Sequence, residues 1–455
     1  MRPNRRIMFL VAADCSCALA AMAAAMYLRF MRPPRLEDLG EFALVKVTGF
    51  VLVVMFLSFL AEFYHNHRLL PAREIAVRMG LSLGVSSLFF SAVIWQVPAC
   101  GQPTGLFTSA VIIFGFLQFA SHAVYRMFVK FRGFARRVLI LGVGRFAGRL
   151  GALIPAADEN YILSGYLDCS NESPDVPAGA ILAGDGGLYE TVKREKADTI
   201  VVSLAERRGV FPYQEVMACK LDGIDVIDAP SFYEQLTGKL LLEAINPSWI
   251  IFSDGFKVSL LKKAAKRAMD LACAVIGLVL TLPFLPLIAA LIKLDSPGPV
   301  FYRQKRVGER ERRFMLYKLR TMRQDAESAT GAVWASTNDP RVTRLGAFMR
   351  KSRIDELPQF FNILRGDMSM VGPRPERPEF VERLKKSIPY YSERHFVKPG
   401  VTGWAQVRYP YGASEEDAME KLRYDLFYIK NLTLTFDVMI ILETIKVVLY
   451  RKGAR

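Results

Sequence analysis

Four long apolar segments dominate the first part of the chain, at residues 7–28, 43–61, 79–97 and 105–124. Each approaches the roughly 20 residues that an α-helix needs to span a bilayer. The pattern therefore predicts a bundle of four transmembrane helices within residues 1–130. Because the number of spans is even, both flanks lie on one side. The basic N-terminus and the basic residues at 126–137 predict that this side is cytoplasmic.

Two charged residues, Asp14 and Lys46, interrupt the first two apolar segments. An ionisable residue inside a membrane segment is a functional candidate by default. Each of these lies near a segment end, however. It is therefore at least as good an interpretation that each side chain reaches to the membrane interface or pairs with a residue of another helix.

Residues 134–250 change to short apolar runs separated by helical stretches, with strands expected at 138–141, 162–167, 199–204 and 224–227. This alternation predicts a small parallel sheet in a Rossmann-like α/β domain. The loop with Gly142, Gly144 and Gly148, followed by Asp168 at the end of the second strand, is only a weak nucleotide signal. We favour a nucleotide-free scaffold and keep a bound nucleotide as the alternative.

A fifth apolar block at 269–294 decides the topology of everything after it. Pro283 and Pro286 lie in its middle, where proline breaks helical hydrogen bonds. The half before Pro283 reaches only about 21 Å at about 1.5 Å per residue, which is short of the roughly 30 Å hydrocarbon core. Because both flanks are basic, the sequence predicts a re-entrant helix that returns to the cytoplasmic face; a kinked spanning helix is the alternative.

Residues 352–376, which read SRIDELPQFFNILRGDMSMVGPRPE, hold the candidate chemistry. The apolar residues Leu357, Phe360, Phe361 and Leu364 recur at helical spacing and predict one buried stripe of a helix that ends at Gly366. Asp355 and Glu356 would then lie at the start of that helix, where free N–H groups favour anions. The plain alternative is a helix cap with a solvated neighbour.

Charged neighbours favour the chemical interpretation of this acid pair. Asp367 adds a third carboxylate that could share a cation. Arg374 stands in a stiff Gly-Pro-Arg-Pro turn and has the side chain best shaped for a phosphate. Lys318, Arg320 and Arg323 form a second basic cluster. Acids for a hard cation beside cations for phosphates indicate a phosphoryl-transfer site.

The composition and the placement of charge limit the classes of partner that the protein is expected to bind. The formal charge of +16 could suggest nucleic acid, but the basic residues cluster beside apolar segments. That placement favours anionic lipids at a membrane surface, and no nucleic-acid partner is expected. The six cysteines show neither zinc spacing nor a disulfide framework. The largely apolar segment 436–450 predicts a helix that lies in the membrane interface or packs on the core.

Several long motifs from about residue 263 onward resemble the bacterial sugar transferase family, the monotopic phosphoglycosyl transferases. They appear in one order: KRAMDLACAV, PGPVFYRQKRVG at 297–308, LYKLRTM at 316–322, DELPQFFNILRGDMSMVGPRP, and KPGVTGWAQV at 398–407. The resemblance implies a mainly α-helical catalytic domain over 260–455, with the helix break of the family at Pro283. It also implies a protein of the bacterial inner membrane with this domain on the cytoplasmic face.

The family's chemistry, carried over by motif, implies transfer of a sugar 1-phosphate from a UDP-sugar to undecaprenyl phosphate. This is the first membrane step of exopolysaccharide, O-antigen or capsule synthesis. Asp355 would be the nucleophile that forms an aspartyl–phosphosugar intermediate as UMP leaves, and Glu356 would hold Mg²⁺ with Asp355 and Asp367 assisting. Arg374, Lys318 and Arg320 would bind phosphates.

One motif departs from the family. A Gly-Arg-Asn often follows the GWAQV-type motif, whereas Arg408-Tyr-Pro-Tyr-Gly follows here, so Arg408 is only a substitute candidate for binding phosphate. The expected partners are the UDP-sugar, undecaprenyl phosphate, membrane lipids and, as one option, a second copy of the chain.

Two other functions stay open. Four spans before a Rossmann-like domain also describe membrane-bound nucleotide-sugar dehydratases or epimerases, although the Tyr189–Lys193 pair comes early for their Tyr-x-x-x-Lys. A non-catalytic assembly scaffold is the alternative for the N-terminal half.

Overall fold

The structure is a computed structural model of the whole chain. It describes residues 5–39, 42–60, 63–64, 79–80, 82–87, 90, 105–130, 135–157, 161–169, 173–204, 211–244, 255–256, 259–324, 326, 339–409, 412 and 414–449. Contacts between residues divide the chain into two compact units, Met1–Phe232 and Tyr233–Arg455.

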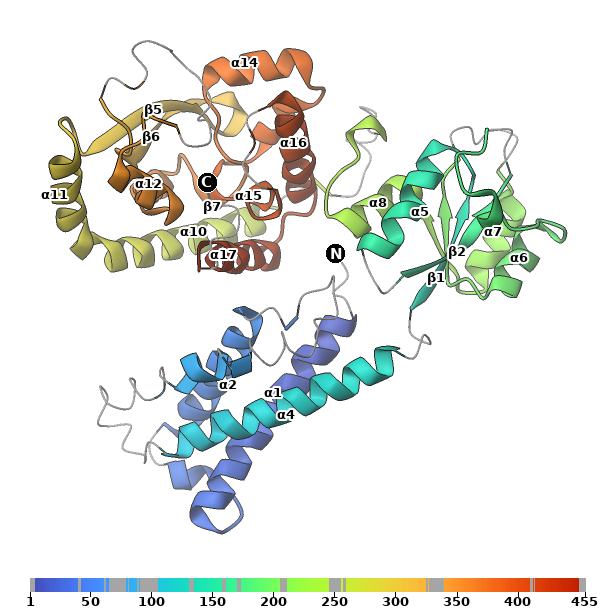
Figure 1. Cartoon of the computed structure of the whole chain (residues 1–455), viewed down its shortest axis with the longest axis horizontal. Helices are drawn as coiled ribbons and strands as arrows, with labels where there is room; N and C mark the ends of the chain where they lie inside the picture. Colours follow the sequence, from blue (N-terminus) through green and yellow to red (C-terminus); the bar gives the residue numbers. More distant parts are fainter. Residues whose placement is uncertain are drawn as a thin grey trace. The chain divides into compact units, whose positions relative to one another are not determined.

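Three long helices, α1 (Arg5–Phe30), α2 (Ala43–Leu60) and α4 (Gly105–Lys130), pack together at the start of the first unit (Figure 1). Small residues such as Ala18, Ala21 and Ala25 are fully buried on α1 and allow its close approach to the neighbouring helices. Within the described residues, Met8–Phe30 and Gly105–Tyr125 are long and apolar enough to cross a membrane, and Ala43–Phe59 is a shorter apolar helix. Most of the predicted third span at 79–97 lies outside the described residues.

Asp14 is fully buried in this bundle and pairs between helices. Its carboxylate accepts hydrogen bonds from Tyr64 Oη and Gln118 Nε2, both at 2.7 Å, and lies 3.1 Å from His122 Nε2. Of the two interpretations given for this charge, pairing between helices therefore applies. Lys46 instead donates to the carbonyl of Leu39, beyond the N-terminus of its own helix.

A four-stranded parallel sheet forms the α/β part, as predicted. Its strands are β1 (Arg136–Leu141), β2 (Tyr161–Leu167), β3 (Thr199–Val202) and β4 (Asp225–Asp228), in the order β2-β1-β3-β4. The helices of this part are α5 (Arg145–Ala157), α6 (Gly187–Glu195), α7 (Tyr213–Leu221) and α8 (Ala229–Thr237), which continues into the second unit.

Close contacts within the chain itself explain the glycines of the predicted loop. Gly142 has a positive φ of 121°, and a Cβ there would lie 2.4 Å from the carbonyl oxygen of Ser203. A Cβ at Gly148 would lie 2.3 Å from the carbonyl oxygen of Asp175. These glycines thus permit close backbone packing.

The second unit is built around two small sheets. Strands β5 (Phe301–Val307) and β6 (Arg313–Leu319) form an antiparallel hairpin, and β7 (Ser369–Val371) pairs in parallel with β8 (Gly400–Thr402). The helices around them are α12 (Arg344–Lys351), α13 (Gln359–Arg365), α14 (Pro378–Ser387), α15 (Trp404–Arg408), α16 (Glu415–Lys430) and α17 (Leu434–Leu449).

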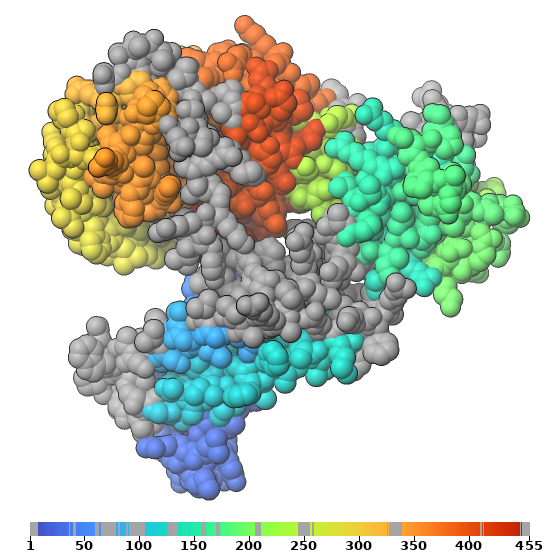
Figure 2. All heavy atoms as spheres, viewed as in Figure 1, coloured from blue at the N-terminus to red at the C-terminus, as the bar shows by residue number. Residues whose placement is uncertain are grey.

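The long apolar helix of this unit is broken near its middle. Helix α10 (Leu260–Thr281) ends at a 3₁₀ turn, η5 (Leu282–Phe284), and α11 (Leu285–Asp295) continues in a different direction (Figure 1). Pro283 lies in this turn. In the space-filling view the yellow residues of this segment form an outer surface of the unit (Figure 2), and many are exposed and apolar, including Ile276, Val279, Leu280, Phe284 and Leu287. The segment as a whole is also long enough to cross a membrane.

Helix α17 packs on the core, which was one of the two interpretations of the segment at 436–450. Phe436 and Ile440 are buried in the main cluster of this unit. Asp437 is fully buried between Lys266 Nζ at 2.8 Å and Tyr428 Oη at 2.7 Å. The described part of this helix is therefore anchored through both its apolar and its charged residues.

Candidate active site

The acid pair lies on a short 3₁₀ turn, η7 (Ile354–Glu356), between α12 and α13. Both Asp355 and Glu356 are only 6% exposed. The predicted start of the helix was therefore wrong by one turn, because the α-helix begins at Gln359 after Pro358. The predicted end is confirmed, since Gly366 takes a left-handed conformation with φ of 90° and caps the helix.

The predicted buried stripe of this helix is confirmed only in part, because Phe360 and Leu364 are partly buried against a core cluster. The buried residues of α13 are Gln359, Asn362 and Ile363, whereas Phe361 is 43% exposed. The reason is a polar contact to β6: Asn362 Oδ1 accepts the N–H of Tyr317 at 3.2 Å, and its Nδ2 donates to the carbonyl of Met315 at 2.7 Å. The helix thus turns an amide toward a strand edge that would otherwise lack partners.

Three cations surround the carboxylate of Glu356. Oε1 lies 2.7 Å from Arg374 Nη2 and 3.2 Å from Lys318 Nζ, and Oε2 lies 3.3 Å from Arg353 Nη1. Burial alone would raise the pKa of Glu356, but these three charges lower it well below its usual range. Glu356 is therefore ionised, and both of its oxygens are engaged.

Asp355 has a different environment although it is the next residue. Lys318 Nζ lies 4.0 Å from its Oδ2, which is an ion pair at the limit of contact. Burial raises the pKa of Asp355, and the neighbouring charge of Glu356 raises it further, whereas Lys318 opposes the shift. A buried carboxylate with a raised pKa and few partners is a more basic oxygen nucleophile than a solvated one.

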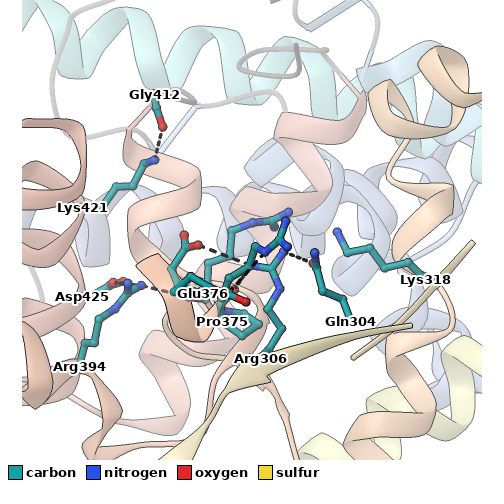
Figure 3. Close-up of polar contacts among 12 residues, drawn as sticks. Gln304, Arg306, Lys318, Pro375, Glu376, Arg394, Gly412, Lys421 and Asp425 are labelled. Atoms are coloured by element: carbon teal, nitrogen blue, oxygen red, sulfur yellow. Dashed lines mark hydrogen bonds and ion pairs between the residues drawn. The ribbon is translucent and has the colours of Figure 1, made fainter. Parts of the chain in front are cut away.

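The turn that presents Arg374 is held from two sides. Arg394 Nη2 donates to the carbonyl of Arg374 at 3.0 Å and to Asp425 Oδ2 at 2.8 Å, and Arg306 Nη1 donates to the carbonyl of Pro375 at 3.0 Å (Figure 3). Because Arg394 and Asp425 are both buried, this brace is fixed within the core. The turn therefore holds the Arg374 side chain against the acid pair.

Three other predicted site residues have contacts of their own. Asp367 accepts from Asn362 Nδ2 at 3.4 Å and pairs with Arg365. Arg320 donates to the carbonyl of Ser296 at 2.6 Å, at the end of α11. Arg408 stacks over Trp404, with 4.4 Å between its guanidinium carbon and the ring centroid. Within the described residues, no three acidic, histidine or cysteine side chains form a group that could hold a metal ion.

Sequence reasoning missed two arginines beside the acids. Arg353 is the left-handed residue, with φ of 58°, that directs the chain into η7. Arg306 reaches the site from β5 and lines a cavity of about 10 Å³ together with Leu316, Lys318, Gln359, Arg374 and Pro375. The basic stretch at 297–308 holds both Arg303 and Arg306, and its composition alone did not distinguish them, because the strand and its register were not predicted.

The alternative nucleotide-sugar chemistry gains no support from its candidate pair. Tyr189 donates its hydroxyl to Asp222 Oδ2 at 2.5 Å on the exposed side of α6 and α7, and Lys193 Nζ lies 4.1 Å from the Tyr189 ring centroid. The pair thus serves local contacts between two helices.

Comparison with known proteins gives a consistent result. The profile described as "Bacterial sugar transferase" matches residues 261–451. The chain is 42% identical over 259 residues to the UDP-N-acetylgalactosamine-undecaprenyl-phosphate N-acetylgalactosaminephosphotransferase of Aeromonas hydrophila; the match covers 57% of this chain and 60% of that protein. It is 42% identical over 208 residues to the UDP-glucose:undecaprenyl-phosphate glucose-1-phosphate transferase of Escherichia coli K12, covering 45% of this chain and 44% of that one.

A shorter relative is matched over nearly all of its length. The exopolysaccharide production protein PSS of Rhizobium leguminosarum bv. phaseoli is 40% identical over 185 residues, which is 40% of this chain and 92% of that protein. The residues matched by the family profile, 261–451, contain the acid pair, its cations and nearly all of the broken helix. On these matches and this geometry, the chain belongs to the bacterial sugar transferase family.

Proposed function

We propose that this protein transfers a sugar 1-phosphate from a UDP-sugar to undecaprenyl phosphate and releases UMP. The observation that carries the proposal is the buried pair Asp355 and Glu356, with Lys318 and Arg374 held against it. Relatives named as undecaprenyl-phosphate sugar phosphotransferases support the same reaction. It would be the first membrane step in making an exopolysaccharide or a related surface polymer.

The reaction would proceed in two displacements. A carboxylate oxygen of Asp355 attacks the phosphorus that carries the sugar, a new P–O bond forms, and the P–O bond to UMP breaks. An oxygen of the lipid phosphate then attacks the same phosphorus, and the bond to Asp355 breaks. The carboxylate is thereby restored, and the sugar ends on a lipid diphosphate. Arg374 and Lys318 would stabilise the negative charge of the phosphoryl oxygens in both steps.

The donor set at the acid pair fits a magnesium ion that arrives with the substrate. Mg²⁺ is usually bound through one or two carboxylates and substrate phosphates. Because both oxygens of Glu356 already contact cations, the fit favours Asp355 as the protein ligand, with Glu356 next to it. Bound there, the ion would offset the charge of the diphosphate.

The site would face the cytoplasmic side of the inner membrane. The exposed apolar residues along the broken segment α10–η5–α11 support a membrane-embedded hairpin, and the prolines in its middle support a return to the same face. A shallow hairpin of this kind would bring the catalytic unit to the surface where a lipid phosphate lies.

A burst experiment tests the proposal. Purified full-length protein is mixed with each of a panel of UDP-sugars, without the lipid, and UMP is measured over the first turnover. We expect one sugar to give UMP in an amount equal to the enzyme, followed by slow hydrolysis. Asp355→Asn should give no burst and no protein-bound phosphosugar.

A matched acid serves as the control. Asp367→Asn removes a carboxylate that lies outside the pair, so it should keep the burst. A burst from Asp355→Asn would remove this residue from the nucleophile's role. Wild-type protein that releases UMP only when lipid is present would instead indicate a single displacement.

A further inference from the structure

Arg306 is next to the acid pair. Within the described residues, however, it makes no hydrogen bond or ion pair with Asp355 or Glu356. Its Nη2 donates to Gln304 Oε1 at 2.6 Å, and its Nη1 donates to the carbonyl of Pro375 and lies 3.5 Å from Glu376 Oε2 (Figure 3). The side chain is only 17% exposed. Its guanidinium group is therefore held in one orientation beside the turn that carries Arg374.

One donor of this group is left over. Within the described part of the chain, no acceptor lies within hydrogen-bond distance of the buried Nε of Arg306. A buried donor without a partner is destabilising, so such a group usually has a ligand or an ordered water in the working protein. Burial and the nearby charges of Arg374 and Arg377 also lower the pKa of Arg306, which an anion would reverse.

The cavity in front of these side chains has a size that suits one oxygen atom. It measures about 10 Å³, close to the smallest space that holds a water. Arg306, Lys318 and Arg374 line it from three different segments, β5, β6 and the turn after β7. Glu356 contacts the last two and offsets part of their charge, whereas the ion pair of Arg306 within the described residues is the longer one to Glu376.

We propose that Arg306 is a third phosphate-binding residue, whose Nε–H donates to a phosphate oxygen seated between Arg306, Lys318 and Arg374. This inference rests on the proposed function and adds a ligand to its site. A guanidinium fixed by Gln304 and Pro375 is preorganised to bind a phosphate, because it needs little reordering when the anion arrives. The phosphate belongs either to the nucleotide diphosphate or to the lipid, and the two share this chemistry.

Binding and kinetic measurements on full-length protein separate these sources. Arg306→Gln is compared with Arg303→Gln, which removes the same charge from the same strand. Arg303 is exposed and stacks on Tyr317 instead of facing the cavity. The dissociation constants of UDP and uridine are measured, together with the KM for undecaprenyl phosphate.

For a donor phosphate, we expect Arg306→Gln to bind UDP about 10-fold more weakly, or about 1.4 kcal/mol, with uridine unchanged. For a lipid phosphate, UDP binding stays as in the wild type and the KM for undecaprenyl phosphate rises by about the same factor. Either result supports the site. Unchanged values in a folded variant, or an equal loss in Arg303→Gln, would overturn it.

A second variant covers the case in which Arg306→Gln does not fold. Arg306→Lys keeps the charge and a donor for the Pro375 carbonyl but has no Nε–H, so it should fold and still bind phosphate more weakly. A folded lysine variant with wild-type constants would mean that Arg306 only braces Pro375. Failure of the proposed function is distinct, since wild-type protein would then release no UMP from any UDP-sugar.

Discussion

Glu356 is more strongly paired than Asp355, and this difference separates the roles of two adjacent carboxylates. Among the described residues, Asp355 has one cation at the limit of contact, whereas Glu356 joins Lys318, Arg353 and Arg374. A group that holds three cations in place acts mainly by positioning. A group that is buried with few partners is free to react.

This arrangement predicts a specific outcome for Glu356→Gln. We expect kcat/KM to fall by about 100-fold or more, because Lys318 and Arg374 lose the charge that orients them toward phosphates. The Mg²⁺ concentration that gives half-maximal activity should stay close to that of the wild type. Steady-state rates over a Mg²⁺ series measure both quantities.

An exposed acid provides the control for that experiment. Glu379 has a 60% exposed side chain and pairs with Arg377 at 3.7 Å, so Glu379→Gln should leave both quantities unchanged. A large rise in the Mg²⁺ requirement of Glu356→Gln would make Glu356 a metal ligand, as its position in the family's motif implies.

His395 predicts a pH dependence of stability. Burial and the charge of Arg394 lower its pKa from 6.5 to about 4. The unfolded chain then takes up a proton near pH 6.5, whereas the folded chain does so only near pH 4. Stability from this group is therefore complete above pH 6.5 and is lost as the pH falls from 6.5 to 4, by roughly 3 kcal/mol at most.

Thermal unfolding of wild type and His395→Gln between pH 4 and 7 checks this expectation. The melting temperature of the wild type should fall more steeply toward acid than that of the variant. Parallel curves would show that His395 takes up its proton equally in both states.

At the residue scale, the sequence indicated those neighbours of the acid pair whose position is set by their own strand or turn. Lys318 follows the alternation of β6, and Arg374 stands in a rigid turn, so both reach the acids. Arg320 shares the parity of Lys318, but β6 ends at Leu319, so the alternation no longer fixes its direction. Asp367 and Arg408 instead contact residues of their own segments, since Asp367 pairs with Arg365 and Arg408 stacks on Trp404.

At the scale of elements, α13 shows how a polar contact can override apolar periodicity. The four apolar residues at helical spacing are only partly buried or exposed, while Asn362 is fully buried against β6. The strands of the parallel sheet were predicted well because each is a short apolar run between turn residues. The buried face of α13 was predicted only in part because it includes two amides, Gln359 and Asn362.

Substitutions in α13 test this account. Asn362→Leu leaves the N–H of Tyr317 and the carbonyl of Met315 without a partner, so we expect a loss of about 2–4 kcal/mol in the free energy of unfolding. Phe361→Ser should change it by less than about 1 kcal/mol, since its ring is 43% exposed. Thermal unfolding of full-length protein in detergent measures both.

The opposite order of the two stability losses would support the apolar stripe that the sequence predicts. If Phe361→Ser were the more damaging substitution, the apolar stripe and not Asn362 would dock the helix.

At the scale of the whole molecule, length and composition indicate a membrane protein with several parts, but not the path of its broken helix. Leu260–Asp295 is long and apolar enough to cross a bilayer, which would place the active site outside the cell. The turn at η5 and the basic residues on both sides favour the other path. Hydropathy alone does not distinguish the two, because both bury the same apolar residues in lipid.

Cysteine labelling at Ser259 and Arg312 decides between these paths. The two residues are exposed and flank the segment α10–η5–α11, and each is replaced by cysteine in a protein whose six native cysteines have been removed. For a hairpin, we expect a membrane-impermeant maleimide to label neither position in intact spheroplasts and both after permeabilisation. The physical reason is that a lysine- and arginine-rich flank on each side stays with the cytoplasmic face. Labelling of Arg312→Cys alone in intact spheroplasts would mean that the helix spans the membrane, and the catalytic unit would then lie on the outer face.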